Sequence, residues 1–252
     1  MVLTVRVIPC LDVRDGQVVK GVQFQNLRAA GDPAELAAEY ERQGADELAL
    51  LDISATPQGK RTCVETIRRV RAALMLPLLV GGGVRSVDDA AALLEAGADK
   101  VSINTAAVER PELIDELADR FGRQCMVLAI DAAMATDDRF EVVTRSGKCR
   151  TGIDAAVWAG QAAQRGAGEI LLTSWDRDGT LEGYHLGLIT QVAGEVDVPI
   201  IASGGARSAE HMAEAVAAGA TGLLAASIFH YRQWTASQLK DQLATMGVEV
   251  RP

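Results

Sequence analysis

Short apolar segments and segments with helical periodicity alternate eight times along the 252 residues of this chain. The apolar segments are rich in branched residues and have the length of buried strands. They occupy residues 6–12, 46–53, 76–82, 99–104, 125–131, 169–174, 198–205 and 221–227. Helices over 35–43, 87–95 and 112–120 are preceded by the start signals Asp32, Ser86 and Pro111. Eight strand-helix repeats predict a closed parallel (β/α)8 TIM barrel, with residues 1–252 forming a single domain.

Charge and composition exclude several classes of protein. The 25 Lys and Arg against 34 Asp and Glu give a net charge of −9, which argues against binding nucleic acid by broad phosphate neutralisation. No apolar run approaches the roughly 18 residues of a membrane helix, and residues 1–10 lack the sections of a signal peptide. The four scattered cysteines and three histidines form no metal-binding pattern. We therefore expect a cytoplasmic globular protein that contacts neither nucleic acid nor membrane.

The chain repeats part of its sequence at one constant offset. PLLVGGGVRS at 77–86 matches PIIASGGARS at 199–208, and GADE at 44–47 matches GAGE at 166–169, each pair being 122 residues apart. This offset is close to half the length of the chain. It predicts that the barrel consists of two similar half-barrels related by an approximate two-fold axis.

Glycine turns after the third and seventh strands predict two phosphate sites. Residues 81–83 and 204–205 are glycines, and each group is followed by a serine that opens a helix. Glycine allows a ligand to approach the backbone, and a helix start offers unpaired N–H groups. The next strands end at 104–105 and 226–227, which are again 122 residues apart. Such glycines also serve in plain tight turns, but their duplication favours two matching phosphate cradles.

Side chains alternate between the two faces of a strand, so the numbering shows which residues share a face. Asp12 shares a face with Cys10, and Asp131 shares one with Ala129. The first and fifth strands of an eight-stranded barrel lie opposite each other, which places the two carboxylates across the mouth. A lone aspartate at a strand end often caps a helix. Two facing carboxylates predict an acid/base pair, provided that burial raises at least one pKa towards neutrality.

The same inward faces begin with charged residues at the other end of the barrel. They are Arg6, Glu47, Lys100 and Glu169. At about 3.3 Å per residue, this ring lies about 20 Å below the carboxylates. Buried charges must be paired, so a structural ion-pair layer is one interpretation. The other interpretation is a passage for a small molecule, because hydrophobic side chains would close the floor at a lower free-energy cost. The residues alone do not decide between these two interpretations.

Over its full length the sequence resembles a family of histidine biosynthesis, the cyclase subunit of imidazole glycerol phosphate synthase. The resemblance lies in IPCLDVRDGQVVKGVQF, LRAAGDP, GADELALLDIS, VGGGVRS, GADKVSINTAAV, VLAIDA, GAGEILLTSWDRDGT, PIIASGGA and LAASIFH. It implies a reaction of ammonia with N′-phosphoribulosyl-formimino-aminoimidazole carboxamide ribotide, a ketose with two phosphates. The products would be imidazole glycerol phosphate and aminoimidazole carboxamide ribotide, formed without a metal or redox cofactor.

The resemblance also implies roles for individual residues. Asp12 and Asp131 fall on the acid/base pair of the family, and the floor ring falls on its ammonia gate. Substrate and phosphates would be held by Lys20, Gly83, Asn104, Thr105, Thr173, Asp178, Gly179, Ser203, Gly205, Ala226 and Ser227. Lys20 would lie in a long loop after the first strand and, without the resemblance, would be taken for a solvated loop charge.

A partner subunit is expected as well. The family takes its ammonia from a separate glutaminase docked on the barrel floor, at the N-terminal face of the strands. This chain contains no candidate glutaminase triad of its own. The resemblance therefore implies a heterodimer.

Some features leave alternatives open. Ala29, Ala133 and His185 replace residues that are common in the family, and Ala133 puts the tuning of Asp131 in doubt. The polar segment 132–152 predicts either a long loop or a hairpin. Two other functions stay possible: the sister isomerase of the same pathway, and a catalytically silent phosphate-binding scaffold that activates a glutaminase.

Overall fold

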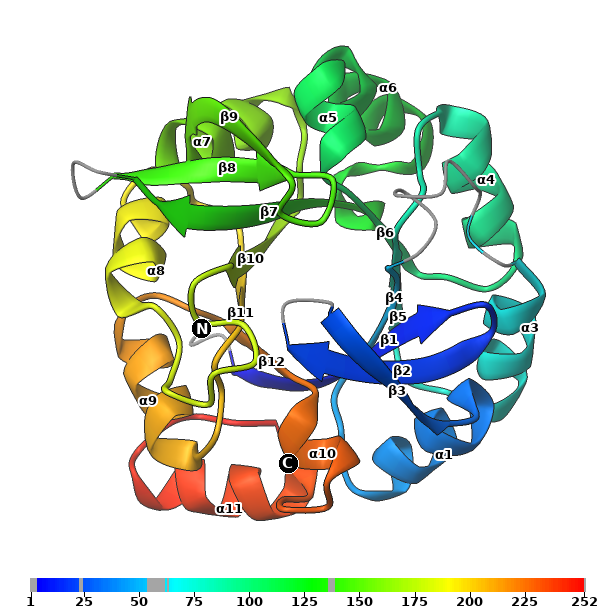
Figure 1. The fold of residues 1–252 in the computed structure, drawn as a ribbon, viewed down its shortest axis with the longest axis vertical. Helices are drawn as coiled ribbons and strands as arrows, with labels where there is room; N and C mark the ends of the chain where they lie inside the picture. Colours follow the sequence, from blue (N-terminus) through cyan, green and yellow to red (C-terminus); the bar gives the residue numbers. More distant parts are fainter. Residues whose placement is uncertain (1–3, 23–24, 54–61, 63, 136–138, 252) are drawn as a thin grey trace.

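Eight parallel strands close into a barrel that is surrounded by helices (Figure 1). The computed structural model describes residues 4–22, 25–53, 62, 64–135 and 139–251, without the side chains of residues 20–29. The barrel strands, in ring order, are β1 (Arg6–Arg14), β4 (Leu48–Asp52), β5 (Leu78–Gly81), β6 (Lys100–Ile103), β7 (Met126–Met134), β10 (Glu169–Ser174), β11 (Ile200–Ser203) and β12 (Gly222–Ala225). Pairing of β1 with β12 and of β7 with β10 completes the ring, so the predicted (β/α)8 barrel is confirmed.

The helices lie on the outside of the barrel, and two short ones stand at its mouth. The outer helices are α1 (Pro33–Arg42), α3 (Val64–Ala73), α4 (Val87–Glu95), α6 (Glu112–Phe121), α7 (Ala155–Arg165), α8 (Leu186–Ala193), α9 (Ala209–Ala217) and α11 (Ala236–Thr245). The short helices α5 (Thr105–Glu109) and α10 (Ser227–His230) directly follow β6 and β12, and the 3-10 turn η1 (Arg123–Cys125) precedes β7. None of the helices in the described part of the chain has the length and apolar run needed to cross a bilayer.

The predicted helix starts are borne out in detail. Asp32 caps α1, where its side chain accepts hydrogen bonds from the backbone N–H groups of Ala34 and Glu35. Ser86 caps α4 by accepting from the N–H of Asp89. Both caps satisfy backbone donors that have no partner within the helix. The helix boundaries differ from the predicted ones by at most two residues.

The alternation of side chains along the strands produces two separate apolar layers. Outward-facing residues such as Val7 and Leu11 pack beneath the helices. Inward-facing residues fill the centre of the barrel, and this inner cluster consists of Ile8, Cys10, Ala49, Leu79, Val127, Leu171, Ile201 and Leu224. The parity deduced from the sequence is therefore correct, and the inner cluster lies between the floor and the mouth.

Two strands of the barrel extend beyond the mouth into antiparallel excursions. β1 pairs with β2 (Gln17–Val22), which pairs with β3 (Gln25–Gly31). β7 pairs with β8 (Phe140–Thr144), which pairs with β9 (Cys149–Asp154). The expected long loop around Lys20 is wrong, because its backbone belongs to β2. Of the two interpretations of segment 132–152, the hairpin is correct.

The Asp15-Gly16 pair is the signal for the first excursion that the sequence interpretation overlooked. Both residues have positive φ, 49° and 77°. This is the geometry of the two-residue hairpin turn that Asp-Gly favours.

The two halves of the barrel share their backbone geometry at the predicted offset. The helix caps Ser86 and Ser208 have φ and ψ of −147° and 166° and of −144° and 170°. Gly82 and Gly204 have φ of 95° and 92°. The excursions after β1 and β7 also occupy equivalent places, since these strands stand opposite each other in the ring. Structure and sequence therefore both show the duplication.

Replacing Gly82 tests the close contact between its backbone and that of Asp52 at the mouth of the barrel. In Gly82→Ala the new Cβ would lie 2.1 Å from the carbonyl oxygen of Asp52, on a backbone with φ of +95°. We expect this variant to lose at least about 3 kcal/mol of unfolding free energy in urea titrations. Gly152→Ala is the matched control, because Gly152 has φ of +74° but nothing within 4 Å. It should cost about 1 kcal/mol, and equal losses in both variants would contradict the close contact.

Candidate active site

A cavity of about 500 Å³ opens at the carboxyl ends of the barrel strands. This is the end at which (β/α)8 barrels carry their active sites, and the volume suits a small-molecule ligand. All predicted substrate-site residues with described side chains line it: Asp12, Gly83, Asn104, Thr105, Asp131, Thr173, Asp178, Gly179, Ser203, Gly205, Ala226 and Ser227. The side chain of Lys20 lies outside the described residues. The structure thus brings together residues from both halves of the chain.

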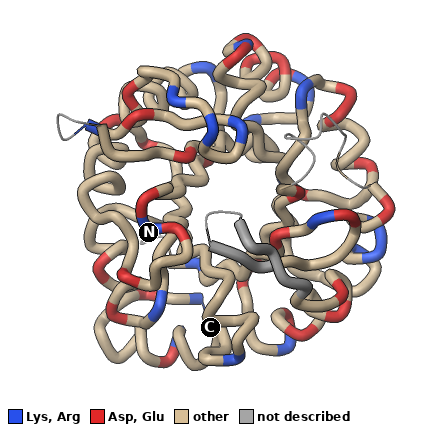
Figure 2. The backbone as a smooth tube through the Cα atoms, in the orientation of Figure 1, with Lys and Arg blue, Asp and Glu red and all other residues tan. Residues whose placement is uncertain are grey.

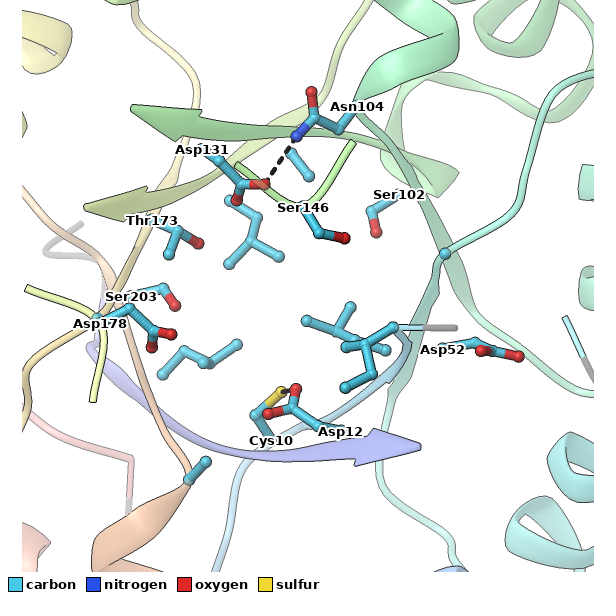
Figure 3. Close-up of a pocket in the computed structure, with 18 of the residues that line it drawn as sticks. Cys10, Asp12, Asp52, Ser102, Asn104, Asp131, Ser146, Thr173, Asp178 and Ser203 are labelled. Carbon is cyan, nitrogen blue, oxygen red and sulfur yellow. Dashed lines mark hydrogen bonds between the residues drawn. The ribbon is translucent and has the colours of Figure 1, made fainter. Parts of the chain in front are cut away.

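Asp12 and Asp131 face each other across this cavity. They come from β1 and β7, on opposite sides of the ring, and their carboxyl groups point towards each other (Figure 3). Asp12 is only 6% exposed. The thiol of Cys10, two residues earlier on β1, donates to Asp12 Oδ1 at 3.6 Å. The cavity therefore has a carboxylate on each of two opposite walls.

The surroundings of Asp131 favour its protonated form. Burial is the main cause, the negative charge of Asp178 adds to it, and together they raise the pKa of Asp131 to about 7. The amide of Asn104 opposes this by donating to Asp131 Oδ2 at 3.0 Å (Figure 3). A carboxyl group with a pKa near neutrality can both give and take a proton at physiological pH.

Glycines shape both ends of the cavity so that an anion can approach the backbone. Gly204 and Gly205 have φ of 92° and 94°. A Cβ on Gly205 would lie 2.2 Å from the carbonyl oxygen of Gly183. The N-termini of α5 and α10 follow at the same rim, where helix starts present N–H groups to anions. The geometry can thus accept one anionic group at each end.

At the opposite end of the barrel, the four predicted charged side chains form a closed ring. Arg6 pairs with Glu47 at 2.7 Å and with Glu169. Lys100 pairs with Glu47 at 2.9 Å and with Glu169 at 2.7 Å. Burial disfavours the charged guanidinium, but the two carboxylates outweigh it and raise the pKa of Arg6. Each charge in the ring therefore has two partners of opposite sign.

Several residues that line the cavity were missed by the sequence interpretation. Asp52 ends β4 directly after the inward-facing Leu51 and reaches the rim of the cavity, and the sequence interpretation did not consider it. Its carboxyl group points away from the cavity (Figure 3). Arg145, Ser146 and Lys148 come from the turn between β8 and β9. These residues could have been predicted to line the cavity only if segment 132–152 had been assigned as a hairpin that folds back to the mouth.

The departures from the family pattern leave the cavity intact. Ala133 is buried on β7 opposite Glu141, and the charge that acts on Asp131 is that of Asp178. His185 still caps α8, because its Nδ1 accepts from the N–H of Leu188 at 3.4 Å. The side chain of Ala29 lies outside the described residues. Within the residues that the structure describes, no three His, Cys, Asp or Glu side chains are placed to hold a metal ion.

Comparison with known proteins gives consistent matches along the whole chain. Residues 6–235 match the family model described as histidine biosynthesis protein. A protein of Streptomyces avermitilis named imidazole glycerol phosphate synthase subunit HisF is 54% identical over 251 residues, which cover all of both chains. Proteins of the same name from two strains of Mycobacterium tuberculosis are 53% identical and cover 99% of this chain and 96% of their own length.

The raised pKa of Asp131 predicts how stability depends on pH. The stability that the protonated Asp131 gives the folded state is fully present below its ordinary pKa of 3.8. It is lost as the pH rises from there to about 7, because in this range the unfolded chain releases the proton while the folded state retains it, and above about 7 the loss is complete. Asp131→Asn cannot ionise. The unfolding free energy of this variant, relative to that of the wild type, should therefore rise by on the order of 2 kcal/mol between about pH 4 and pH 8. This figure is smaller than the full pKa shift implies, because the carboxyl group lines an open cavity and is screened by solvent. Urea unfolding of both proteins at both pH values measures this change. If the stability difference between variant and wild type is the same at the two pH values, the raised pKa of Asp131 is contradicted.

Proposed function

This chain belongs to the histidine biosynthesis family, among the cyclase subunits of imidazole glycerol phosphate synthase, and from that membership we propose how its cavity works. The chain is an enzyme of the cyclase type. In the proposed reaction, ammonia and N′-phosphoribulosyl-formimino-aminoimidazole carboxamide ribotide give imidazole glycerol phosphate and aminoimidazole carboxamide ribotide. The observation that carries the proposal is the pair of carboxyl groups, Asp12 and Asp131, which face each other between two glycine-lined ends of one cavity.

The substrate would span the cavity with one phosphate at each end. Gly83, Asn104 and Thr105 would hold the first phosphate, and Gly179, Ser203, Gly205, Ala226 and Ser227 would hold the second. Thr173 and Asp178 would contact the middle of the substrate, and Lys20 would close over it. The reacting carbons would then lie between the two aspartates, which line opposite walls of the same cavity.

Proton transfer is the work that the two aspartates would do. Attack of ammonia, formation of an imine, cleavage of the C–N bond and ring closure each require protons to be added or removed. With a pKa of about 7, Asp131 exists in both protonation states at neutral pH. Asp12 would exchange protons with the opposite side of the substrate. Carboxyl groups on two walls allow one to donate while the other accepts.

Family membership implies a complex with a glutaminase subunit, which would supply the ammonia. We propose that this partner docks on the barrel floor and that Arg6, Glu47, Lys100 and Glu169 form the gate through which ammonia enters. The ring closes the floor directly beneath the inner apolar cluster, on the axis that leads to the cavity. As a biosynthetic enzyme, the complex would act in the cytoplasm.

Replacing the aspartates tests the central step. Asp12→Asn and Asp131→Asn should each lower ammonium-dependent formation of imidazole glycerol phosphate by the isolated chain at least about 100-fold, because general acid/base catalysis contributes that much. Asp52→Asn is the matched control, since Asp52 also lines the rim but points away from the cavity (Figure 3). It should retain activity within about tenfold.

The same assay separates the rival functions. The sister isomerase would form no imidazole product, and a silent scaffold would form none without catalysis by another chain. The names of the relatives do not favour either. Full activity in both aspartate variants would refute the acid/base assignment.

The proposed gate makes a separate prediction. Lys100→Ala removes one cation and leaves Glu47 and Glu169 partly unpaired. It should lower glutamine-dependent turnover of the complex about tenfold more than ammonium-dependent turnover, equivalent to about 1.4 kcal/mol in the barrier. Lys240→Ala, which breaks the buried pair of Lys240 with Asp46 outside the ring, should affect both activities equally. Equal losses in Lys100→Ala would contradict a gate.

A further inference from the structure

The turn between β8 and β9 overhangs the rim of the cavity. Figure 2 shows basic segments at this place, on the inner edge of the mouth. Arg145, Ser146 and Lys148 all line the cavity, and the side chain of Ser146 points into it (Figure 3). None of these three residues belongs to the phosphate sites predicted from the sequence. The turn is thus an additional wall of the site.

The backbone of this turn is held in a conformation that side chains disfavour. Arg145 and Ser146 have φ of 54° and 56°, although neither is glycine. Gly147 follows with φ of +76°, and a Cβ on it would lie 2.1 Å from the ring of Trp175. The indole therefore supports the turn from outside. Strain that the surrounding structure maintains is often found at ligand-binding positions.

Arg145 connects the turn to the end of the cavity formed by the N-terminal half. Its backbone N–H donates to Thr105 Oγ1 at 3.1 Å. Its guanidinium pairs with Glu109, at the other end of α5, with Nη2 and Oε1 2.8 Å apart. The side chains of Arg145 and Glu109 are 63% and 56% exposed, so this pair lies in solvent. An exposed pair of this kind is weak and readily exchanged.

The charges that line the cavity are distributed unequally between its two ends. Among the described lining residues, the carboxylates are Asp12, Asp52, Glu109, Asp131 and Asp178, and the cations are Arg85, Arg145 and Lys148. Arg85 follows the glycines of the first end, and the other two stand on the turn beside Thr105. Within this described set, the end formed by Gly205 and Ser227 has no cation. A phosphoryl dianion would therefore meet positive side chains at the end lined by Gly83, Asn104 and Thr105.

We propose that Arg145 is a substrate-binding residue whose guanidinium exchanges Glu109 for the phosphoryl group held by Gly83, Asn104 and Thr105. The identity of that group as a substrate phosphate rests on the proposed function. A guanidinium binds phosphate through two parallel hydrogen bonds, and a dianion attracts it more strongly than a solvated carboxylate does. Glu109 would then compete with the substrate for Arg145.

Opposite effects of the two partners distinguish this role from a structural one. In ammonium-dependent turnover by the full chain, Arg145→Met should raise KM for the substrate about tenfold and change kcat less than about twofold. Glu109→Gln frees the guanidinium and should lower KM about two- to threefold. Arg150→Met is the control, because Arg150 pairs with Glu141 on the same hairpin and does not line the cavity. It should leave KM unchanged.

Two results would overturn the proposal. If Arg145→Met and Glu109→Gln both raise KM, the pair merely holds the turn in place. If Arg145→Met leaves KM unchanged, the guanidinium does not reach the phosphate.

Titration with inorganic phosphate by calorimetry provides an arm that needs no turnover. The wild type should bind phosphate about tenfold more tightly than Arg145→Met. If the wild type shows no turnover but still binds phosphate more tightly than Arg145→Met, the proposed function is refuted and the anion site at Arg145 is supported. Equal phosphate affinity in an active wild type and in Arg145→Met would refute the role of Arg145 alone.

Discussion

The closed ring of parallel strands is the constraint on which the other features depend. All strands end at one rim, and every second side chain of each strand faces one interior. Along β1 the inward positions run from the floor charge Arg6 through Ile8 and Cys10 to Asp12 at the mouth. A register shift of one residue would turn Leu11 inward and place Asp12 beneath the helices. Core, floor and cavity therefore share a single register.

In the proposed function, the duplication of the half-barrels would separate phosphate binding from chemistry. Backbone groups can bind phosphate, and the backbone angles of the two glycine turns agree within a few degrees at Gly82 and Gly204. The side chains at equivalent positions do not agree. Asn104 donates to Asp131, whereas its counterpart Ala226 has no polar group to offer. The symmetric backbone suits a substrate with two similar ends, and the unequal side chains suit a reaction that occurs between them.

Much of this arrangement could be predicted from the sequence, because it follows from local rules. Strand parity placed Asp12, Asp131 and the floor ring, and the repeat placed both glycine turns. The rest depends on contacts between distant segments. The raised pKa of Asp131 arises mainly from burial that only the closed barrel creates, and to a smaller extent from the charge of Asp178, 47 positions further along the chain (178 − 131). The turn at 145–148 reaches the mouth because a hairpin folds back over α5, which no periodicity in the sequence indicates.

The floor ring requires an explanation other than stability. Burying an ion pair costs much of what its attraction returns, and apolar residues of similar volume often stabilise a fold at least as well. Two positions further along three of the same strands, the inner cluster has the apolar residues Ile8, Ala49 and Leu171, so this barrel can accommodate such residues. The ring has two positive and two negative members and so carries no net charge. In the proposed conduit, neutral ammonia could pass without disturbing this balance, whereas ammonium would bring an uncompensated charge into the apolar layer above.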